Sequence, residues 1–179
     1  MRRYITFVLC VIITAILLSG CNLLARYRML HERISINWSS VEQAADKLTS
    51  VLDSADAESL KKMFSYNTQV AVDSLDGQVK DLLDFYEGGS TTYEIKAGPI
   101  ESKHVSYGIV EEYFQVSIIL TTATQQYCVA FQSYTRDDAD ENNVGITSLY
   151  IAKKEDVSAA FAYWGDGEWR EGITILYKD

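Results

Sequence analysis

The chain has 179 residues, and its 25 acidic against 16 basic side chains give a formal net charge of −9. Removal of residues 1–20, which hold two arginines and no acid, would leave 14 basic against 25 acidic residues and a net charge of −11. Such a surface repels the phosphate backbone, and the sequence has no stripe of Lys and Arg with interleaved aromatics, so we expect no nucleic-acid partner. The remaining length fits a single domain with a substantial core.

The N-terminus combines a basic start, an apolar stretch and a small-residue exit. Arg2 and Arg3 precede an apolar run over residues 4–18, and Ser19 and Gly20 follow it. This pattern is typical of a secretory signal peptide. The apolar run is shorter than the roughly 20 residues that a spanning helix needs. We therefore predict a signal peptide over residues 1–20 rather than a permanent membrane span.

The end of this run, Leu18-Ser19-Gly20-Cys21, resembles the lipobox of bacterial lipoproteins. The resemblance implies cleavage between Gly20 and Cys21 and lipidation of the Cys21 sulfur, with acyl chains such as palmitate holding the mature chain on the membrane. Several acyl chains together give stable attachment. The expected location is the extracytoplasmic face of the cell membrane. An uncleaved anchor or an ordinary signal peptide remains the alternative.

The segment after the cleavage site, residues 21–35, is a membrane-proximal lead-in before a single domain over residues 36–179. Arg26, Arg28 and Arg33 are clustered in it, although the chain is otherwise acidic. These arginines either rest on anionic headgroups, at about 1 kcal/mol each, or carry incidental charge. The sequence leaves both interpretations open.

Cysteine and histidine usage argues against redox and metal chemistry. After processing and lipidation only Cys128 remains, so no intramolecular disulfide is expected. Its apolar neighbours indicate a small buried side chain rather than a nucleophile. The two histidines, His31 and His104, give no metal-ligand spacing, and no glycine-rich phosphate loop or nucleophile elbow occurs. We predict no metal and no cofactor.

The first half of the domain has helical periodicity. Apolar residues recur at helical spacing over residues 41–52, where Ser39 and Ser40 are predicted N-caps and Glu42 and Gln43 their capping-box partners. A second, short helix is predicted after Asp56. A third is predicted over residues 75–86, with Gly88-Gly89 as a left-handed stop.

Beyond Gly89 the period changes to two. Alternating or continuous apolar runs predict four strands joined by short turns, which together form an antiparallel meander. A sheet with one apolar face needs a cover, and the helices supply it. The predicted fold is α+β, with three N-terminal helices packed on a curved antiparallel sheet of about four strands, over residues 92–97, 110–120, 127–134 and 146–152.

Several segments carry family resemblances. Three helices followed by a curved antiparallel sheet resemble the nuclear-transport-factor-2-like (cystatin-like) cone, a fold that includes ketosteroid isomerases and secreted binding modules. More narrowly, the chain is similar over about residues 36–176 to a lipoprotein family of Firmicutes that carries domain of unknown function 5104. That resemblance implies fold and location and adds no catalytic motif. The segments that carry these resemblances are residues 18–21, 56–64, 81–89, 127–131 and 164–173.

The acidic stretch over residues 137–143 suggests a calcium-binding loop. Asp138, Asp140 and Asn142 match the first three oxygen ligands of a helix-loop-helix calcium loop. The match fails further on, because Asn143 stands where glycine is needed and Leu149 where a bidentate glutamate is needed. We expect a solvated hairpin tip, with weak calcium binding left open.

Acid–base catalysis would need a carboxylate or histidine alone in an apolar cavity with a tyrosine donor. Enzymes with this fold usually carry a tyrosine on the first helix, and residues 41–52 have none. Glu111 and Glu112 are adjacent on a strand and so face opposite ways. The catalytic residues stay unknown, with His104, Tyr107, Glu111, Glu112, Tyr113 and Asp73 as the candidates.

The aromatic residues suggest binding instead. Tyrosine and tryptophan favour half-wet pockets and contact surfaces, and the Gly-Asp-Gly turn between Trp164 and Trp169 is a candidate recognition edge. We expect a non-enzymatic module that binds a small ligand or an envelope protein, with an isomerase or hydrolase built in the cone cavity as the alternative. The candidate pocket or recognition residues are His104, Tyr107, Tyr113, Phe131, Trp164 and Trp169.

Overall fold

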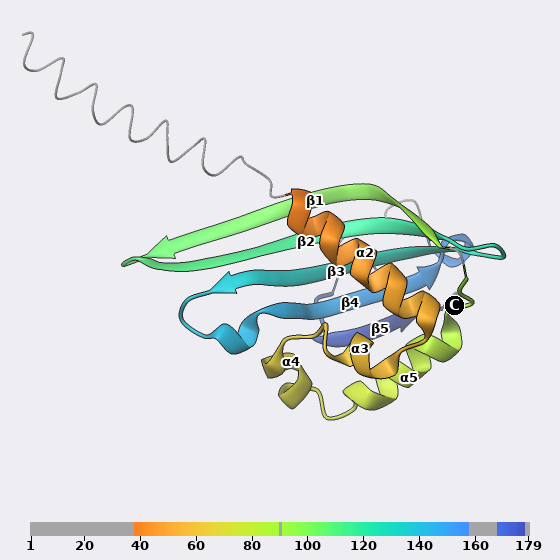
Figure 1. Cartoon of the computed structure of the whole chain (residues 1–179), viewed down its shortest axis with the longest axis horizontal. Helices are drawn as coiled ribbons and strands as arrows, with labels where there is room; N and C mark the ends of the chain where they lie inside the picture. The colour runs from red at the N-terminus through yellow and green to blue at the C-terminus, as the bar shows by residue number, and fades with distance from the viewer. Residues whose placement is uncertain (1–37, 90, 158–167, 178–179) are drawn as a thin grey trace, which may run out of the picture. The chain divides into compact units, whose positions relative to one another are not determined.

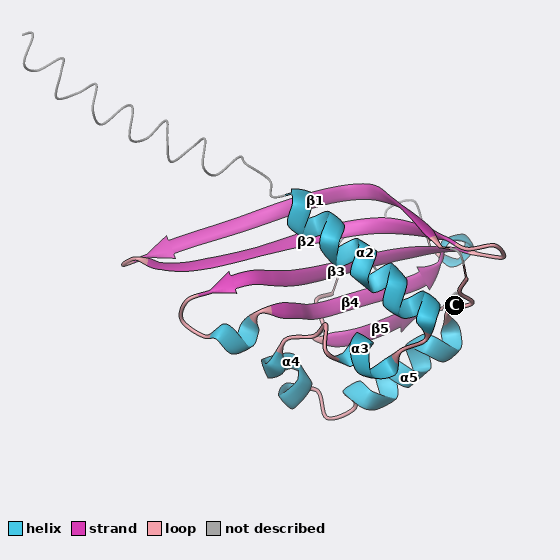
Figure 2. Cartoon of the chain, in the orientation of Figure 1, coloured by secondary structure: helices cyan, strands magenta, loops and turns pink. Residues whose placement is uncertain are grey.

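The computed structural model describes residues 38–89, 91–157 and 168–177. Four helices precede the first strand in this part of the chain, and two short 3-10 helices flank the fourth strand (Figures 1 and 2). The elements are α2 (Trp38–Ser54), α3 (Ala57–Lys61), α4 (Tyr66–Ala71), α5 (Leu75–Phe85), β1 (Thr92–Ser106), β2 (Ile109–Thr121), β3 (Gln126–Asp137), η1 (Glu141–Asn143), β4 (Gly145–Lys153), η2 (Lys154–Asp156) and β5 (Gly172–Leu176).

The predicted α+β class is confirmed, but the sheet has five strands rather than about four. Its spatial order is β1-β2-β3-β4-β5. The first four strands form the predicted antiparallel meander, whereas β5 pairs parallel to β4. The strand missed from the sequence is only five residues long. So short a run carries little periodicity, and its parallel partner is fixed by tertiary packing.

The helix boundaries correct two predictions. Helix α2 begins at Trp38, so Ser39 and Ser40 lie inside it and the capping box is wrong. Helix α5 ends at Phe85 because its C-cap, Tyr86, is extended at ψ 110°. The chain therefore leaves the helix before Gly88-Gly89, and a Cβ on Gly88 would lie 2.6 Å from the Tyr86 ring. The glycine there permits close packing and does not end the helix.

The two shortest helices are held by side-chain caps. Helix α3 begins directly after Asp56, as predicted, and the Asp56 side chain caps it by accepting a hydrogen bond from the Ser59 amide at 3.0 Å. Helix α4 was not predicted; the Ser65 hydroxyl caps it by accepting from the Thr68 amide at 3.1 Å. Such caps satisfy amides that have no partner within the helix. Neither helix would be stable alone.

The main core lies between the helices and one face of the sheet. Apolar side chains of α2, α3 and α5 are buried against alternate residues of β2, β3 and β4, as expected for a two-layer α+β fold. Among the largest completely buried side chains are Leu48, Leu60, Leu82, Ile118, Tyr127 and Phe131.

The opposite face of the sheet, here called the outer face, has a smaller buried cluster. Cys128, Ala130, Tyr150 and Ala152 form it. The Tyr150 hydroxyl donates a hydrogen bond to the carbonyl of Glu168, in the stretch that leads into β5. Both faces of the central strands are therefore covered. No helix in residues 38–89, 91–157 and 168–177 has the length and apolar character needed to cross a membrane.

Candidate functional site

The β1–β2 hairpin ends in an arm, residues 100–115, whose tip over residues 105–110 extends past the end of β3 (Figure 1). Its strands are joined by Tyr107 and Gly108, whose φ angles are +51° and +86°. Two successive left-handed residues give the tight turn that matches the twist of a hairpin, and glycine supplies one without strain. The Tyr107 side chain at this tip is fully exposed, at 105%.

The strand register sorts the arm's side chains onto two faces. On the helix side, Glu101 pairs with Phe114, Lys103 with Glu112 and Val105 with Val110. On the outer face, Ile100 pairs with Gln115, Ser102 with Tyr113 and His104 with Glu111. Because side chains alternate along a strand, Glu111 and Glu112 lie on opposite faces, as the sequence predicts.

The outer face of the arm has exposed apolar and aromatic side chains. Ile100 is 48% exposed and Ile109 47%. The rings of Tyr113 and Tyr134 lie 5.1 Å apart at 38° and are half-buried. We call the set Ile100, Tyr107, Ile109, Tyr113 and Tyr134 the recognition surface. Large amphipathic rings beside exposed aliphatic groups are typical of contact surfaces.

The hydroxyl of Tyr134 is held as a hydrogen-bond donor. Burial raises its pKa, and the nearby Glu111 carboxylate raises it further by repelling the phenolate and by accepting a hydrogen bond from the hydroxyl. The phenol therefore remains protonated through the physiological pH range. Tyr134 presents an apolar ring to the outer face and keeps its polar end paired with the arm.

Asp138 joins the arm to the end of β3 through hydrogen bonds with Val110 and Arg136. Its carboxylate accepts from Arg136 Nε at 2.7 Å, from Arg136 Nη2 at 2.8 Å and from the Val110 amide at 3.0 Å. The Asp138 amide in turn donates a hydrogen bond to the Val110 carbonyl at 2.9 Å. The Arg136 hydrogen bonds, opposed by partial desolvation and helped by the Val110 amide, hold the pKa of Asp138 below its usual value. The bidentate geometry fixes orientation as well as charge.

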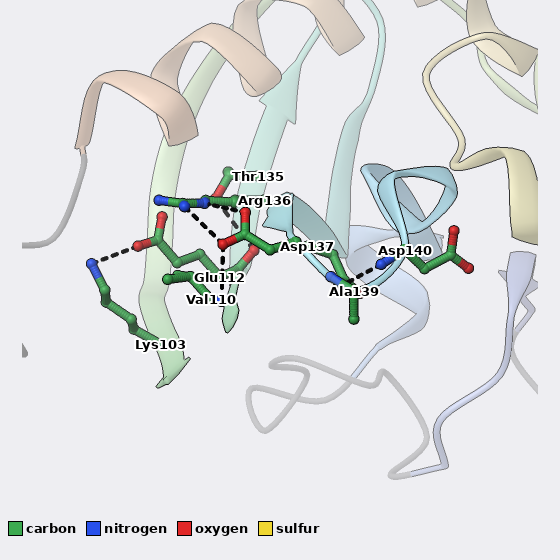
Figure 3. A network of polar contacts seen from close by, with 9 residues as sticks. Lys103, Val110, Glu112, Thr135, Arg136, Asp137, Ala139 and Asp140 are labelled. Atoms are coloured by element: carbon green, nitrogen blue, oxygen red, sulfur yellow. Dashed lines mark hydrogen bonds and ion pairs between the residues drawn. The ribbon is translucent and has the colours of Figure 1, made fainter. Parts of the chain in front are cut away.

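Two further contacts brace the helix side of the arm. Lys103 Nζ lies 2.7 Å from Glu112 Oε1 across the hairpin, and the Thr135 hydroxyl donates to the Glu112 carbonyl at 3.3 Å (Figure 3). Exposed ion pairs contribute little stability individually, and the Lys103–Glu112 pair joins the two strands of the arm to each other. The contacts of Thr135 and Asp138 restrict the arm's movement against β3. A pre-ordered surface loses less conformational entropy on binding.

The structure brings three of the predicted site residues together on the arm: His104, Tyr107 and Tyr113. Trp169 lies apart from them, 46% exposed in the stretch before β5. Phe131 is a correction, because it is buried in the main core at 1% exposure with its ring 5.8 Å from that of Phe114. Gly20, Cys21 and Trp164 lie outside the described residues.

The sequence did not single out Ile100 or Ile109 as site residues. The strand predicted over residues 92–97 stops short of both, whereas β1 continues to Ser106. A signal was present in Tyr107-Gly108, a dipeptide that suits a hairpin turn and would have extended both strands. Recognising that turn would have placed both isoleucines at exposed hairpin positions.

Three of the residues considered for catalysis, Glu111, Glu112 and Cys128, are engaged in other contacts or buried. Glu112 forms an ion pair with Lys103, and Glu111 accepts a hydrogen bond from Tyr134. Cys128 is buried in the outer-face cluster, and burial raises the pKa of its thiol. A thiol that resists ionisation is a poor nucleophile. Glu111 and Glu112 therefore serve the structure of the arm.

The acidic stretch 137–143 is the turn region between β3 and β4, and its carboxylates accept hydrogen bonds from the chain itself. Asp137 accepts from the amides of Ala139 and Asp140 and from Asn143 Nδ2, at 2.8–3.1 Å. Asp140 accepts from Asn67 Nδ2 at 2.8 Å and caps η1. Within the described ranges, no group of three or more His, Cys, Asp or Glu is placed to hold a metal ion.

A second polar feature lies between α2 and the start of β1, where a groove of about 700 Å³ is open to solvent. Asp53 accepts hydrogen bonds there from the amide and hydroxyl of Thr91, the Gly89 amide and the Tyr86 hydroxyl, at 2.5–3.2 Å. Slight burial would raise the pKa of Asp53, but these hydrogen bonds outweigh it and the pKa is lowered. The carboxylate thus ties α2 to the loop before β1.

Together, fold and site define an α+β protein with an open, mostly antiparallel sheet and a braced hairpin arm. The chain belongs to the family described as a domain of unknown function (DUF5104), whose profile matches residues 47–154, more than half of the chain. The matched range contains the whole arm and excludes Trp164, Trp169 and β5. A comparison with curated proteins gave no significant match.

Proposed function

We propose that this protein is a lipid-anchored, extracytoplasmic module that binds another protein of the cell envelope through the recognition surface. The observation that carries the proposal is the arm itself, which presents exposed Ile100, Tyr107 and Ile109 on a hairpin braced by Asp138. We also propose that the domain is a variant of the nuclear-transport-factor-2-like cone. Helices covering one face of an antiparallel sheet support that assignment.

A protein partner fits the arm better than a small ligand does. Small-molecule sites are concave and bury most of their ligand. The helix-covered face, where a cone would open, is filled by side chains such as Leu48, Leu82 and Phe131. The recognition surface is fully exposed at its tip and has exposed apolar side chains on its outer face, which suits the wide contact of a protein interface.

The first experiment tests the anchor. The basic start, the apolar run and Leu18-Ser19-Gly20-Cys21 support lipidation. Cys21→Ser removes the sulfur that would carry the lipid, so we expect the variant to leave the membrane fraction, whereas Cys128→Ser should remain in it. Fractionation with both variants makes the comparison. Persistence of Cys21→Ser in the membrane at the wild-type level would refute lipid anchoring.

The second experiment tests the recognition surface. A photo-reactive phenylalanine analogue is placed at Tyr107, at Ile100 or, as the matched control, at Tyr66, which is 62% exposed on α4. In intact cells we expect a discrete protein adduct from positions 107 and 100 and none from 66. The result is read by gel shift and mass spectrometry of the adduct.

The adduct must also depend on the apolar side chains of the arm. With the partner identified, Ile109→Ser should weaken its binding by at least about tenfold, the effect expected when an interface anchor is removed. Val70→Ser on α4, where the side chain is 60% exposed, should leave binding unchanged. Equal adduct yields from all three positions, or equal affinities of both serine variants for the partner, would show that the arm is not the binding surface.

A further inference from the structure

The recognition surface lies in a strongly acidic part of the molecule. The arm (residues 100–115) and the end of β3 with its following turn (residues 134–143) contain seven carboxylates against two basic side chains, a formal charge of −5 with His104 counted as neutral. The chain as a whole carries −9, so much of its excess negative charge is gathered here. The carboxylates are Glu101, Glu111, Glu112, Asp137, Asp138, Asp140 and Glu141.

The two basic side chains of these segments are already paired within the chain. Lys103 Nζ lies 2.7 Å from Glu112 Oε1, and Arg136 makes the bidentate contact with Asp138. Both lie on the helix side of the arm, because Lys103 and Arg136 are each register partners of Glu112 (Figure 3). The outer face of these two segments therefore has carboxylates without a lysine or arginine of the same segments beside them.

Two carboxylates belong to this outer face. Glu111 and Asp137 are register partners on β2 and β3, so they are directly opposite each other and their like charges repel. Burial raises the pKa of Tyr134, and the charges of Glu111 and Asp137 raise it further. Both negative charges therefore lie close to an aromatic ring of the recognition surface.

The carboxylates of the turn keep their charge. Hydrogen bonds from the Asn143 side chain and from backbone amides hold the pKa of Asp137 below its usual value, and hydrogen bonds led by that of Asn67 do the same for Asp140. These donors are neutral, so they stabilise the ionised carboxylates without cancelling their charge. The turn therefore stays negative through the physiological pH range and adds to the field of Glu111.

We propose that the envelope protein bound by the recognition surface presents an apolar patch rimmed by lysine and arginine, with one of these cations placed against Glu111. The inference rests on the proposed function and names the chemistry of its partner. Apolar contact with Ile100, Tyr107 and Ile109 supplies affinity. The carboxylates speed the encounter with a basic surface and disfavour an acidic one. The same charge repels anionic lipid headgroups and phosphate polymers, which favours a basic protein as the occupant.

The first test is the salt dependence of the adduct. Membrane vesicles are prepared from cells that make the full-length chain with the photo-reactive analogue at position 107. Raising the salt from about 0.01 M to about 1 M shortens the screening length from about 30 Å to about 3 Å, so the adduct yield should fall at least about fivefold. A contact held by apolar surface alone would keep its yield.

A matched pair of double variants then tests the position of the charges. Glu111→Gln with Glu141→Gln removes two negative charges beside the arm and leaves an amide oxygen that can accept from the Tyr134 hydroxyl. Glu58→Gln with Glu155→Gln makes the same net change at exposed positions on α3 and η2. At low salt the first pair should lower the adduct yield at least about threefold, and the second by less than about 1.5-fold.

The adduct itself identifies the partner's chemistry. Mass spectrometry should find the cross-link in a peptide with net positive charge. An adduct specific to positions 107 and 100 that ignores salt and both double variants, or that lies in an acidic peptide, would overturn this inference and leave the proposed function standing. Absence of a specific adduct from both positions would overturn the two together.

Discussion

Replacing Phe131 with alanine should lower the free energy of unfolding by about 3–5 kcal/mol, the range for removing a buried aromatic side chain. Phe131 is 1% exposed and contacts Phe114 edge to face with ring centroids 5.8 Å apart. It lies on β3 within the main core, whose side chains come from helices and strands, so the cavity would collapse only partly. Urea unfolding of the full-length chain, followed by circular dichroism, gives the change in free energy directly.

A matched variant separates the packing role from a binding role. Phe131→Leu keeps most of the buried volume and should cost less than half as much as Phe131→Ala. Below their unfolding midpoints both variants should still give the adduct from position 107, because Phe131 and the recognition surface lie on opposite faces of the sheet. Phe131 would instead belong to the binding site if Phe131→Ala lowered the free energy of unfolding by less than about 1 kcal/mol, or if the folded variant no longer gave the adduct.

The strongly periodic elements could be predicted from the sequence. Helix α5 has its apolar stripe at Leu75, Val79 and Leu82, which are all buried. Strands β2, β3 and β4 begin within one residue of the expected positions. These segments are long enough for the periodic pattern to persist despite local exceptions. Burial of their apolar faces stabilises the helix or strand that the pattern predicts.

The elements that the sequence did not predict are short or locally irregular. Helix α4 is six residues and β5 is five, and each is stabilised by tertiary contacts rather than by its own pattern. The second half of β1 is a polar strand, and the register shifts twice between Ile95 and Ile100. The apolar alternation fades there, although pairing with β2 continues to Ser106.

Those same irregularities explain why the candidate site was only partly predicted. His104, Tyr107 and Tyr113 were selected as single residues, but their meeting on one arm depends on how far β1 continues. Phe131 was selected because it is aromatic and follows an apolar run. Both faces of β3 are covered there, so residues 127–133 are all buried and no alternation marks which side belongs to the core.

Gly145→Ala should be the second strongly destabilising substitution, with an expected loss of about 2–6 kcal/mol in the free energy of unfolding. Gly145 has φ +126°, a conformation in which a side chain is strained, and strain of this kind costs about 1–3 kcal/mol. A Cβ would lie 2.7 Å from the Ser65 amide nitrogen and 3.0 Å from the Met63 carbonyl oxygen. Overpacking adds about 1–3 kcal/mol. Thermal and urea unfolding of the variant measure the sum.

The reason for so large an effect is that Gly145 lies where the helical layer meets the sheet. The Ser65 amide donates to the Ile146 carbonyl at 2.9 Å, and the Ile146 amide donates to the Met63 carbonyl at 2.8 Å. An added methyl group meets backbone atoms, which cannot move aside as a flexible side chain can, so relief would break both hydrogen bonds.

The control is Gly77→Ala, within α5, where nothing lies within 4 Å of an added Cβ. Alanine loses less backbone entropy than glycine when it enters a helix, so this variant should gain about 0.4–1 kcal/mol. The same chemical change thus has opposite signs at the two positions. If Gly145→Ala cost less than about 1 kcal/mol, the close approach of Met63–Ser65 to β4 would be wrong, and with it the junction that orients the helices over the sheet.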